Sequence, residues 1–434
     1  MELMTKQGYK ETEVGLIPED WGLVYFDEIF TFYSTSNYSK AEMREDDEVG
    51  CIHYGLIHAI SNTQYNLNEG IKYYVNSEQA KYALVRDGDV IMVDASEDLE
   101  GVNKSVEVFG IGNKKYISGL HTYLLRDKKK SLADNFRGII LNSSAVKNQM
   151  LQLAVGMKVF GVSKTQLIKV KLPLPTLTEQ KAIATTLSDV DALISSLEQT
   201  ITKKKAIKQG AMQQLLTPPH KGGKRLPGYE GKWEAQNLKD IIWFQEGPGV
   251  RKYQFTKRGV KLLNGTNIQQ GVLDLDRTDR YISEKEAFGW YSHFLVDNGD
   301  ILIACSGITV ARFDEKVTIA EKYHLPLCMN TSTMRFKMKS DSIFKGFFMH
   351  YLKSSDFKKQ IGGQATGSAQ LNFGPSHVEK VIMEIPTSDE QRAIAKILSD
   401  MDAEIAQLES KKEKYQAIKQ GMMQELLTGK TRLK

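Results

Sequence analysis

The chain has 434 residues, more than a single domain usually holds, so two to four domains are expected. Hydrophobic residues make up 41% and charged residues 26%, a balance that excludes a mostly disordered chain. The formal net charge of +5 is too small to identify a nucleic-acid binder by itself.

Membrane and export signals are not found in the sequence. No apolar run approaches the roughly 20 residues that a membrane-spanning helix needs, and the N-terminus lacks the apolar core of a signal peptide. The three cysteines, Cys51, Cys305 and Cys328, have no metal-ligand spacing. We therefore expect a cytoplasmic protein without a disulfide or zinc scaffold.

The first predicted domain covers residues 1–174. Short β-branched runs such as Val90–Val93 follow Gly-Asp turns, and polar stretches that contain glycine separate them. This pattern predicts a domain of mixed α/β structure.

Residues 175–217 are predicted to form a long helix. Its hydrophobic residues recur at steps of 4, 3, 4, 3 and 4, the spacing of a coiled coil: Ile183, Leu187, Val190, Ile194, Leu197 and Ile201. Thr178 near the start is a candidate cap. Such spacing requires a partner helix, whereas a short core helix inside each domain is the alternative.

Residues 218–232 form a linker with three prolines and four glycines, and a second α/β domain covers residues 233–385. Its run Ile301–Ile303 again follows a Gly-Asp turn. Residues 386–434 return to the coiled-coil pattern and end the chain.

The chain contains an internal repeat. The segment that begins at Pro175 matches the one that begins at Pro386 at 26 of 43 positions without a gap, an offset of 386 − 175 = 211 residues. GDVIMV at Gly88 and GDILIA at Gly299 continue the same offset. The predicted fold is therefore α+β or α/β: two globular domains, each followed by a long helix, with the two helices forming an antiparallel coiled coil under pseudo-two-fold symmetry.

No motif for catalysis is found. The sequence lacks a phosphate-binding GxxxxGK[ST] loop, the [DNS]PP[YFW] tetrapeptide of amino-methyltransferases and an HExxH metal motif. Asp300, Asp314 and Lys316 have the carboxylate-x-lysine spacing of metal-dependent nucleases. The last two correspond to Asn103 and Ser105 in the first half, so a charged turn is the favoured interpretation.

Four segments resemble one known family. GYKETEVGLIPEDW, GDILIACSGITVAR, the EQ-containing helix entries and the KQGMMQELLTGKTRL ending are similar to type I restriction-modification specificity (S) subunits. The resemblance covers nearly the whole chain and implies two target-recognition domains that each read half of a split DNA sequence. It also implies helices that space the halves, two methyltransferase (M) subunits and two restriction-translocase (R) subunits.

This resemblance implies a non-catalytic subunit of an adenine-N6 methylating complex. S-adenosylmethionine, ATP and Mg are expected on the partner subunits only, and no cofactor or metal is expected here. The alternatives are a nuclease or methyltransferase that acts alone, and a coiled-coil adaptor without DNA specificity. The adaptor leaves unexplained why the two variable domains diverge while the helices stay nearly identical.

Candidate contacts combine groups that can bind bases or phosphates with aromatic neighbours. The candidate DNA-binding residues are Asn37, Tyr38, Lys40, Tyr54, Lys104, Lys114, Lys158, Arg251, Lys252, Tyr253, Lys257, Arg258, Asn264, Thr266, Asn267, Gln269, Ser306, Thr309, Arg312 and Gln370. Glu179, Gln180, Glu390 and Gln391, with the outer faces of both helices, are candidates for docking the methyltransferase. Helix capping and packing are the alternative for these four residues.

Overall fold

The computed structural model describes residues 7–60, 62–68, 70–78, 81–99, 101–156, 158–362 and 370–433. The chain forms two compact units, one of Met1–Gln199 with Glu409–Lys434 and one of Thr200–Leu408. Each unit therefore contains one globular domain and part of each long helix.

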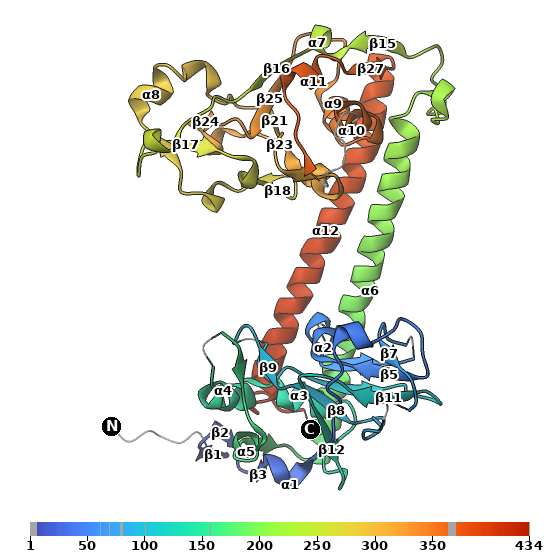
Figure 1. The fold of residues 1–434 in the computed structure, drawn as a ribbon, viewed down its shortest axis with the longest axis vertical. Helices are drawn as coiled ribbons and strands as arrows, with labels where there is room; N and C mark the ends of the chain where they lie inside the picture. The colour runs from blue at the N-terminus through green and yellow to red at the C-terminus, as the bar shows by residue number, and fades with distance from the viewer. Residues whose placement is uncertain are drawn as a thin grey trace. The chain divides into compact units, whose positions relative to one another are not determined.

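The first unit is built on a five-stranded sheet in the order β4-β12-β8-β10-β6. Figure 1 labels β12 and β8 of this sheet. These strands are Phe30–Tyr33, Thr122–Asp127, Val90–Val93, Ser105–Phe109 and Gln64–Asn66. All four residues of β8 are buried, as expected for an apolar run at the centre of a sheet. A second sheet of order β11-β5-β7 joins Lys115–Ser118, Val49–Ile52 and Tyr74–Val75.

The second unit repeats this arrangement. Its four-stranded sheet has the order β16-β25-β21-β23, formed by Ile242–Glu246, Thr333–Met338, Ile301–Ala304 and Val317–Ile319. A three-stranded sheet of order β20-β17-β24 contains Tyr281–Ile282, Val260–Leu263 and Leu327–Met329. The central strands β8 and β21 begin at residues 90 and 301, so 301 − 90 = 211, and the repeat predicted from the sequence extends to the fold.

Short elements complete each unit. In the first, β14 (Lys171–Leu174) pairs with β3 (Gly22–Tyr25), and α3 (Arg137–Leu141) and α4 (Ser144–Leu153) cover the sheet. In the second, β27 (Ile382–Ile385) pairs with β15 (Glu234–Asn237), and α9 (Lys345–Leu352) and α10 (Ser355–Gly362) have the matching role.

The two long helices are α6 (Leu177–Leu215) and α12 (Ser388–Leu426), 39 residues each. In the first unit Ile183 and Leu187 of α6 share a core with Leu426 at the end of α12. In the second unit Ile394 and Leu398 of α12 share a core with Met212 at the end of α6. The start of one helix thus packs against the end of the other in each unit, as the coiled-coil spacing predicts.

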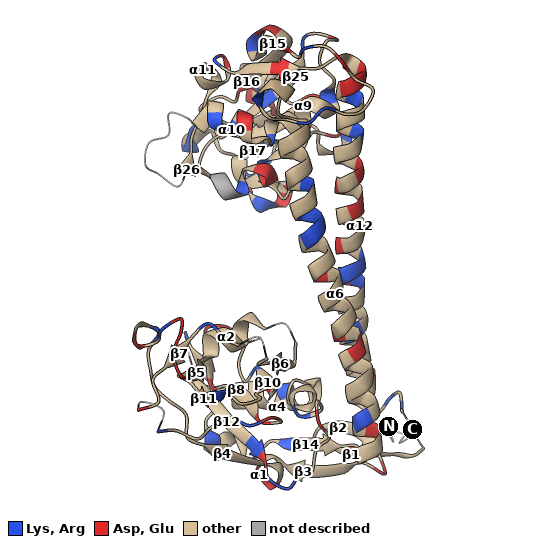
Figure 2. Ribbon diagram, turned by 90° about the vertical axis from the view of Figure 1, so that its right-hand side faces the viewer, with Lys and Arg blue, Asp and Glu red and all other residues tan. Residues whose placement is uncertain are grey.

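Ion pairs in both units confirm that the two helices are antiparallel. In the first unit Asp191 pairs with Lys419 at 2.5 Å and Glu198 with Lys412 at 3.8 Å. In the second unit Lys204 pairs with Glu404 at 2.7 Å, and Lys208 pairs with Asp402. Residue numbers rise along α6 as they fall along α12. Figure 2 marks the acidic and basic residues of both helices in red and blue.

Candidate nucleic-acid interface

A polar cluster in the second unit contains three of the predicted contact residues. Arg312 lies in the 3-10 helix η7 (Val310–Lys316), and its Nη2 donates a hydrogen bond to Gln269 Oε1 at 3.3 Å. Gln269 Nε2 in turn donates to the carbonyl oxygen of Thr266 at 3.0 Å. Arg312 also pairs with Glu315. Because the Arg312 side chain is 58% exposed, this cluster presents a guanidinium to solvent beside the Gln269 amide.

Ser306, Thr309 and Gln370 come together beside a short strand pair. Strand β22 (Ile308–Thr309) pairs with β26 (Gln370–Leu371), with Thr309 opposite Gln370. The Ser306 hydroxyl hydrogen-bonds to Asn372 Oδ1 at 3.0 Å, and the Gly307 amide donates to the same oxygen at 2.8 Å. Asn372 is exposed and was not among the predicted residues. Its amide side chain, two positions after Gln370, is of the type by which the other candidate contacts were chosen.

Asn264 and Asn267 do not reach solvent, which contradicts their prediction as DNA contacts. Asn267 is fully buried; its Oδ1 accepts from the Asn264 amide, and its Nδ2 donates to the carbonyl oxygen of Asp274. Asn264 is 6% exposed and donates to the carbonyl oxygen of Leu262. Both amides hold the turn after β17, because buried polar groups must find partners within the protein.

The predicted basic stretch lies in a lobe with its own small core. Val250, Val260, Leu262 and Cys328 pack together there, and the 3-10 helix η3 (Lys252–Gln254) lies at its surface. The side chains of this stretch are exposed, and that of Tyr253 is 86% exposed: Arg251, Lys252, Tyr253, Lys257 and Arg258.

In the first unit, Lys40 and Tyr54 lie in a surface cluster of aromatic rings. Tyr54 is 41% exposed at the start of α2 (Tyr54–Ala59), and its ring centroid is 5.5 Å from that of His121. His53 lies between Tyr54 and Tyr73, and the Lys40 ammonium is 5.5 Å from the Tyr73 ring. Sequence reasoning missed Tyr73 and His121, because the chain brings them to Tyr54 from distant loops.

His121 also pairs with an acidic residue beside this cluster. Its Nδ1 is 3.3 Å from Asp94 Oδ1, and the histidine side chain is 51% exposed. Burial raises the pKa of the Asp94 carboxyl, although His121 partly opposes the shift. The cluster therefore presents a histidine beside a carboxylate.

The remaining predicted residues of the first unit have varied environments. Lys104 is half-buried, donates to the carbonyl oxygen of His58 at 2.9 Å, and has a pKa lowered by burial. It therefore has a structural contact in addition to any DNA contact. The others are Asn37, which accepts a hydrogen bond from Tyr82, Tyr38, whose ring contacts Tyr82, and the exposed Lys114 and Lys158.

The three residues with nuclease-like spacing do not converge. Asp300 is buried and pairs with Arg335 at 3.1 Å, as Asp89 pairs with Arg126 at 2.6 Å in the first unit. Asp314 pairs with Lys358 of α10, and Lys316 donates to the carbonyl oxygen of Ile268 at 2.7 Å. In the part of the chain that the structure describes, no group of three or more His, Cys, Asp or Glu side chains could hold a metal ion.

Glu179, Gln180, Glu390 and Gln391 are buried, which contradicts their prediction as a docking surface. All four residues are at most 2% exposed. Gln180 accepts from the Ala133 amide at 2.9 Å, and Gln391 accepts from the Phe344 amide at 2.7 Å. Each glutamine also donates to the carbonyl oxygen of the proline five residues earlier. The alternative prediction, helix-start capping and packing, matches these contacts.

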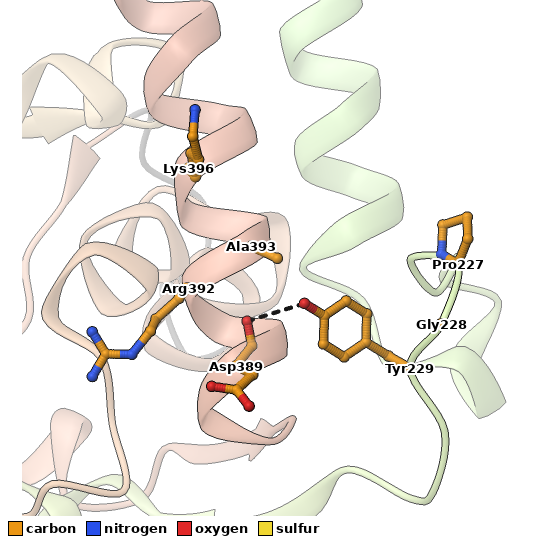
Figure 3. A pocket seen from close by; sticks show the side chains of 7 residues that line it. All are labelled: Pro227, Gly228, Tyr229, Asp389, Arg392, Ala393 and Lys396. Carbon is orange, nitrogen blue, oxygen red and sulfur yellow. Dashed lines mark hydrogen bonds between the residues drawn. The ribbon is translucent and has the colours of Figure 1, made fainter.

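Each buried glutamate is neutralised by an arginine that follows the other helix. In the first unit Arg432 contacts Glu179 at 2.6 Å and Asp20 at 2.8 Å, and the Trp21 indole donates to Glu179 at 2.9 Å. In the second unit Arg225 contacts Glu390 at 2.7 Å. Nearby, the Tyr229 hydroxyl donates to the Asp389 carbonyl oxygen, and the two residues border a hollow that Arg392 and Lys396 also line (Figure 3).

An exposed stripe is identical on the two helices. We call it the outer stripe: Lys203, Ala206, Ile207, Gly210 and Gln213 on α6, and Lys414, Ala417, Ile418, Gly421 and Gln424 on α12. Its spacing places the residues on one helix face, and the two isoleucines are 47% and 40% exposed. A side chain added at either glycine would meet nothing within 4 Å. Exposed positions nearer the helix starts, such as Lys181, Thr185 and Leu193, differ from their counterparts.

A known protein family matches both halves of the chain. The model described as "Type I restriction modification DNA specificity domain" matches twice, over residues 18–209 and 230–420. The chain belongs to this family. Each half carries one specificity domain together with a long helix, and the two domains correspond to the two divergent domains of the fold.

Known proteins of this family resemble the chain over its full length. The MjaVIII specificity subunit of a type I restriction enzyme from Methanocaldococcus jannaschii is 27% identical, and the match covers 100% of this chain and 98% of that protein. The crystal structure of a type I S subunit from M. genitalium has a TM-score of 0.52 at 14% identity, covering 94% of this chain and 96% of its own. A structure from work on assembly and conformational transition of the type I system has a TM-score of 0.57 at 16% identity, covering 96% of this chain and 99% of its own.

Among the described residues, no helix is long and apolar enough to cross a membrane.

Proposed function

We propose that this subunit gives a type I restriction-modification complex its DNA specificity, with each unit reading one half of a bipartite target. The observation that supports this most directly is one framework with two different surfaces. Strands β8 and β21 occupy equivalent central positions, whereas the exposed loops carry Lys40, Tyr54 and His121 in one unit and Arg312 and Gln269 in the other. Divergent polar loops on a repeated scaffold suit two different half-sites.

In this proposal catalysis belongs to partner subunits. Two methyltransferase subunits would hold S-adenosylmethionine, and two restriction-translocase subunits would use ATP and Mg, in the cytoplasm. A nuclease or methyltransferase that acts alone is the alternative, and the separate contacts of Asp300, Asp314 and Lys316 do not favour it.

Replacing one target-recognition domain tests whether the two units read their half-sites independently. We expect that exchanging residues 233–382 for the same region of a relative changes one half of the methylated sequence and leaves the other half as it was. Sequencing that detects methyladenine, in cells with the methyltransferase subunit, provides the measurement. A change in both halves would contradict independent reading by the two units.

We further propose that the outer stripe docks the methyltransferase subunits. Two copies of one partner need two equivalent surfaces, and all five positions of this stripe are identical on α6 and α12. The exposed Ile207 and Ile418 would supply apolar contact, and the glycines would allow close approach.

Charged substitutions in the stripe test this docking. We expect Ile207→Glu to remove one methyltransferase copy and Ile207→Glu with Ile418→Glu to remove both, as measured by the mass of the purified complex. Leu193→Glu is the matched control, since Leu193 is 37% exposed on α6 and its counterpart in α12 is already Glu404. Full assembly of the double variant would exclude the stripe as the docking surface.

A further inference from the structure

Two large aromatic side chains on the lobe around β17 are almost fully exposed. Tyr253 is 86% exposed and Trp290 is 82% exposed. Of the other three tryptophans, Trp21 and Trp233 are buried and Trp243 is half-buried. An exposed indole leaves a large apolar area in water, and a partner that covered it would add to binding.

Hydrogen bonds connect the segments that carry these two aromatic residues. Gln254 Nε2 donates to Glu286 Oε1 and to the Tyr291 hydroxyl oxygen, both at 3.0 Å. Glu286 belongs to α8 (Glu284–Phe288), and Tyr291 follows that helix. Tyr253 precedes Gln254 in the sequence, and Trp290 precedes Tyr291. The hydrogen bond between Gln254 and Tyr291 therefore holds together the two segments that carry the exposed rings.

The charge around this surface is positive. Residues 251–261 contain five Lys or Arg and no acid, and Arg251 and Lys252 immediately precede Tyr253. Helix α8 carries two acidic residues, Glu286 and the exposed Glu284. The Glu286 carboxylate accepts hydrogen bonds from Gln254 and Ser283, which lower its pKa. Cations that bind phosphates, interleaved with aromatic rings that pack on nucleotides, suit a nucleic acid.

The feature is specific to the second unit. At the offset of 211 residues, Tyr253 and Trp290 correspond to Glu42 and Gln79 in the sequence of the first half. The common framework therefore does not require these rings. They belong to the part of the domain that differs between the two target-recognition domains.

We propose that Trp290 and Tyr253 pack against the duplex DNA of the half-site read by the second unit, while Arg251 and Lys252 contact its phosphates. This inference rests on the proposed function and names residues that position one half-site. Burying the two rings against DNA removes their apolar surface from water and adds affinity that the first half-site does not gain in this way.

Tryptophan fluorescence tests the proposal in the full chain with its methyltransferase partner. The difference in emission between the wild-type complex and Trp290→Phe isolates the signal of Trp290. The probes are a duplex that carries the methylated motif mapped in cells, two duplexes with one half-site scrambled, and one with both scrambled. We expect the intact duplex and one of the two half-scrambled duplexes to quench this signal.

Binding titrations provide the second readout. Because Trp290→Ala removes the apolar surface that the indole would bury against the duplex, it should weaken binding of the intact duplex about tenfold. The matched control is Tyr323→Ala, since Tyr323 is 76% exposed in the same unit but lies between Lys322 and His324 in the 3-10 helix η8 (Lys322–His324), outside the stretch of residues 251–261. It should bind DNA as the wild type does.

The possible outcomes separate this inference from the proposed function. Unchanged emission of Trp290 on bound DNA, with unchanged affinity of Trp290→Ala, would overturn the inference and leave DNA reading intact. Quenching by the methyltransferase subunit in the absence of DNA would also overturn it and assign the surface to a protein contact. Equal binding of the intact and fully scrambled duplexes would overturn the proposed function and the inference with it.

Discussion

At the residue scale, the buried glutamates at the helix starts depend on arginines that are distant in the sequence. Glu179 is 2% exposed and receives hydrogen bonds from Trp21 and from Arg432, which follows it by 253 residues. A buried carboxylate is stable only when it is paired and hydrogen-bonded. The segment after α12 that contains Arg432 is therefore needed to pair the buried carboxylate of the first unit.

Removing this arginine should destabilise the first unit. Because breaking a buried ion pair leaves an uncompensated charge, and Arg432 is itself partly exposed, we expect Arg432→Ala to lower the free energy of unfolding by about 2–4 kcal/mol. Urea titration followed by tryptophan emission, in a background where Trp233, Trp243 and Trp290 are replaced by Phe, reports on Trp21 and this site. The control is Lys430→Ala, which removes an exposed pair with Glu425 and should cost about 0.5 kcal/mol or less. Equal losses in the two variants would contradict a special role for Arg432.

At the element scale, the same ion pair recurs at symmetric places in the helix pairing. Asp191 pairs with Lys419 in the first unit, and their counterparts Asp402 and Lys208 pair in the second. The Asp191 and Lys419 side chains are only 11% and 13% exposed, so this contact is shielded from water more than an ordinary surface pair. Its position fixes the register of one helix against the other.

A charge exchange tests this register. Asp191→Lys places two lysines together and should destabilise the first unit by about 1–3 kcal/mol, since like charges meet in a partly buried site. Asp191→Lys combined with Lys419→Asp should recover most of the loss, as measured by thermal unfolding in low salt. Failure of the double variant to recover would show that neighbouring packing, rather than the pair, sets the register.

The helices were predictable from the sequence because their determinants are local. Heptad spacing and flanking prolines predicted segments 175–217 and 386–434, and the helices occupy Leu177–Leu215 and Ser388–Leu426 within them. The candidate contacts were harder to predict, because an amide such as Asn267 looks the same in a sequence whether it caps a turn or faces DNA. The aromatic cluster around Tyr54 depends on loops that only the fold brings together.

At the scale of the whole molecule, each unit is completed by both ends of the repeat. The sequence predicted a domain followed by its own helix, whereas the core of the first unit joins Ile183 of α6 to Leu426 at the end of α12 and to Leu427 just after it. The second unit joins Ile394 of α12 to Met212 near the end of α6 and to Leu216 just after that helix. Each recognition domain is thus held by two antiparallel helices, and the chain changes from one unit to the other within each helix.

This arrangement makes the helices the element that would set the gap between half-sites. Four-residue insertions after Thr200 in α6 and after Leu408 in α12 fall near the boundary between the units and leave the ion pairs on either side intact. Each insertion adds about 6 Å of helix and roughly 400° of rotation, close to a full turn, so the pattern of core residues continues as a stutter.

We expect the methylated motif to keep both half-sites and to gain one or two base pairs between them, since base pairs are spaced about 3.4 Å apart and the helices need not follow the DNA axis. Sequencing that detects methyladenine, in cells carrying the variant and its methyltransferase, measures this gap. An insertion in α6 alone is the control, because its unaltered partner helix resists the change in length. An unchanged gap in a fully assembled, active complex with both insertions would mean that the partner subunits, rather than these helices, determine the spacing.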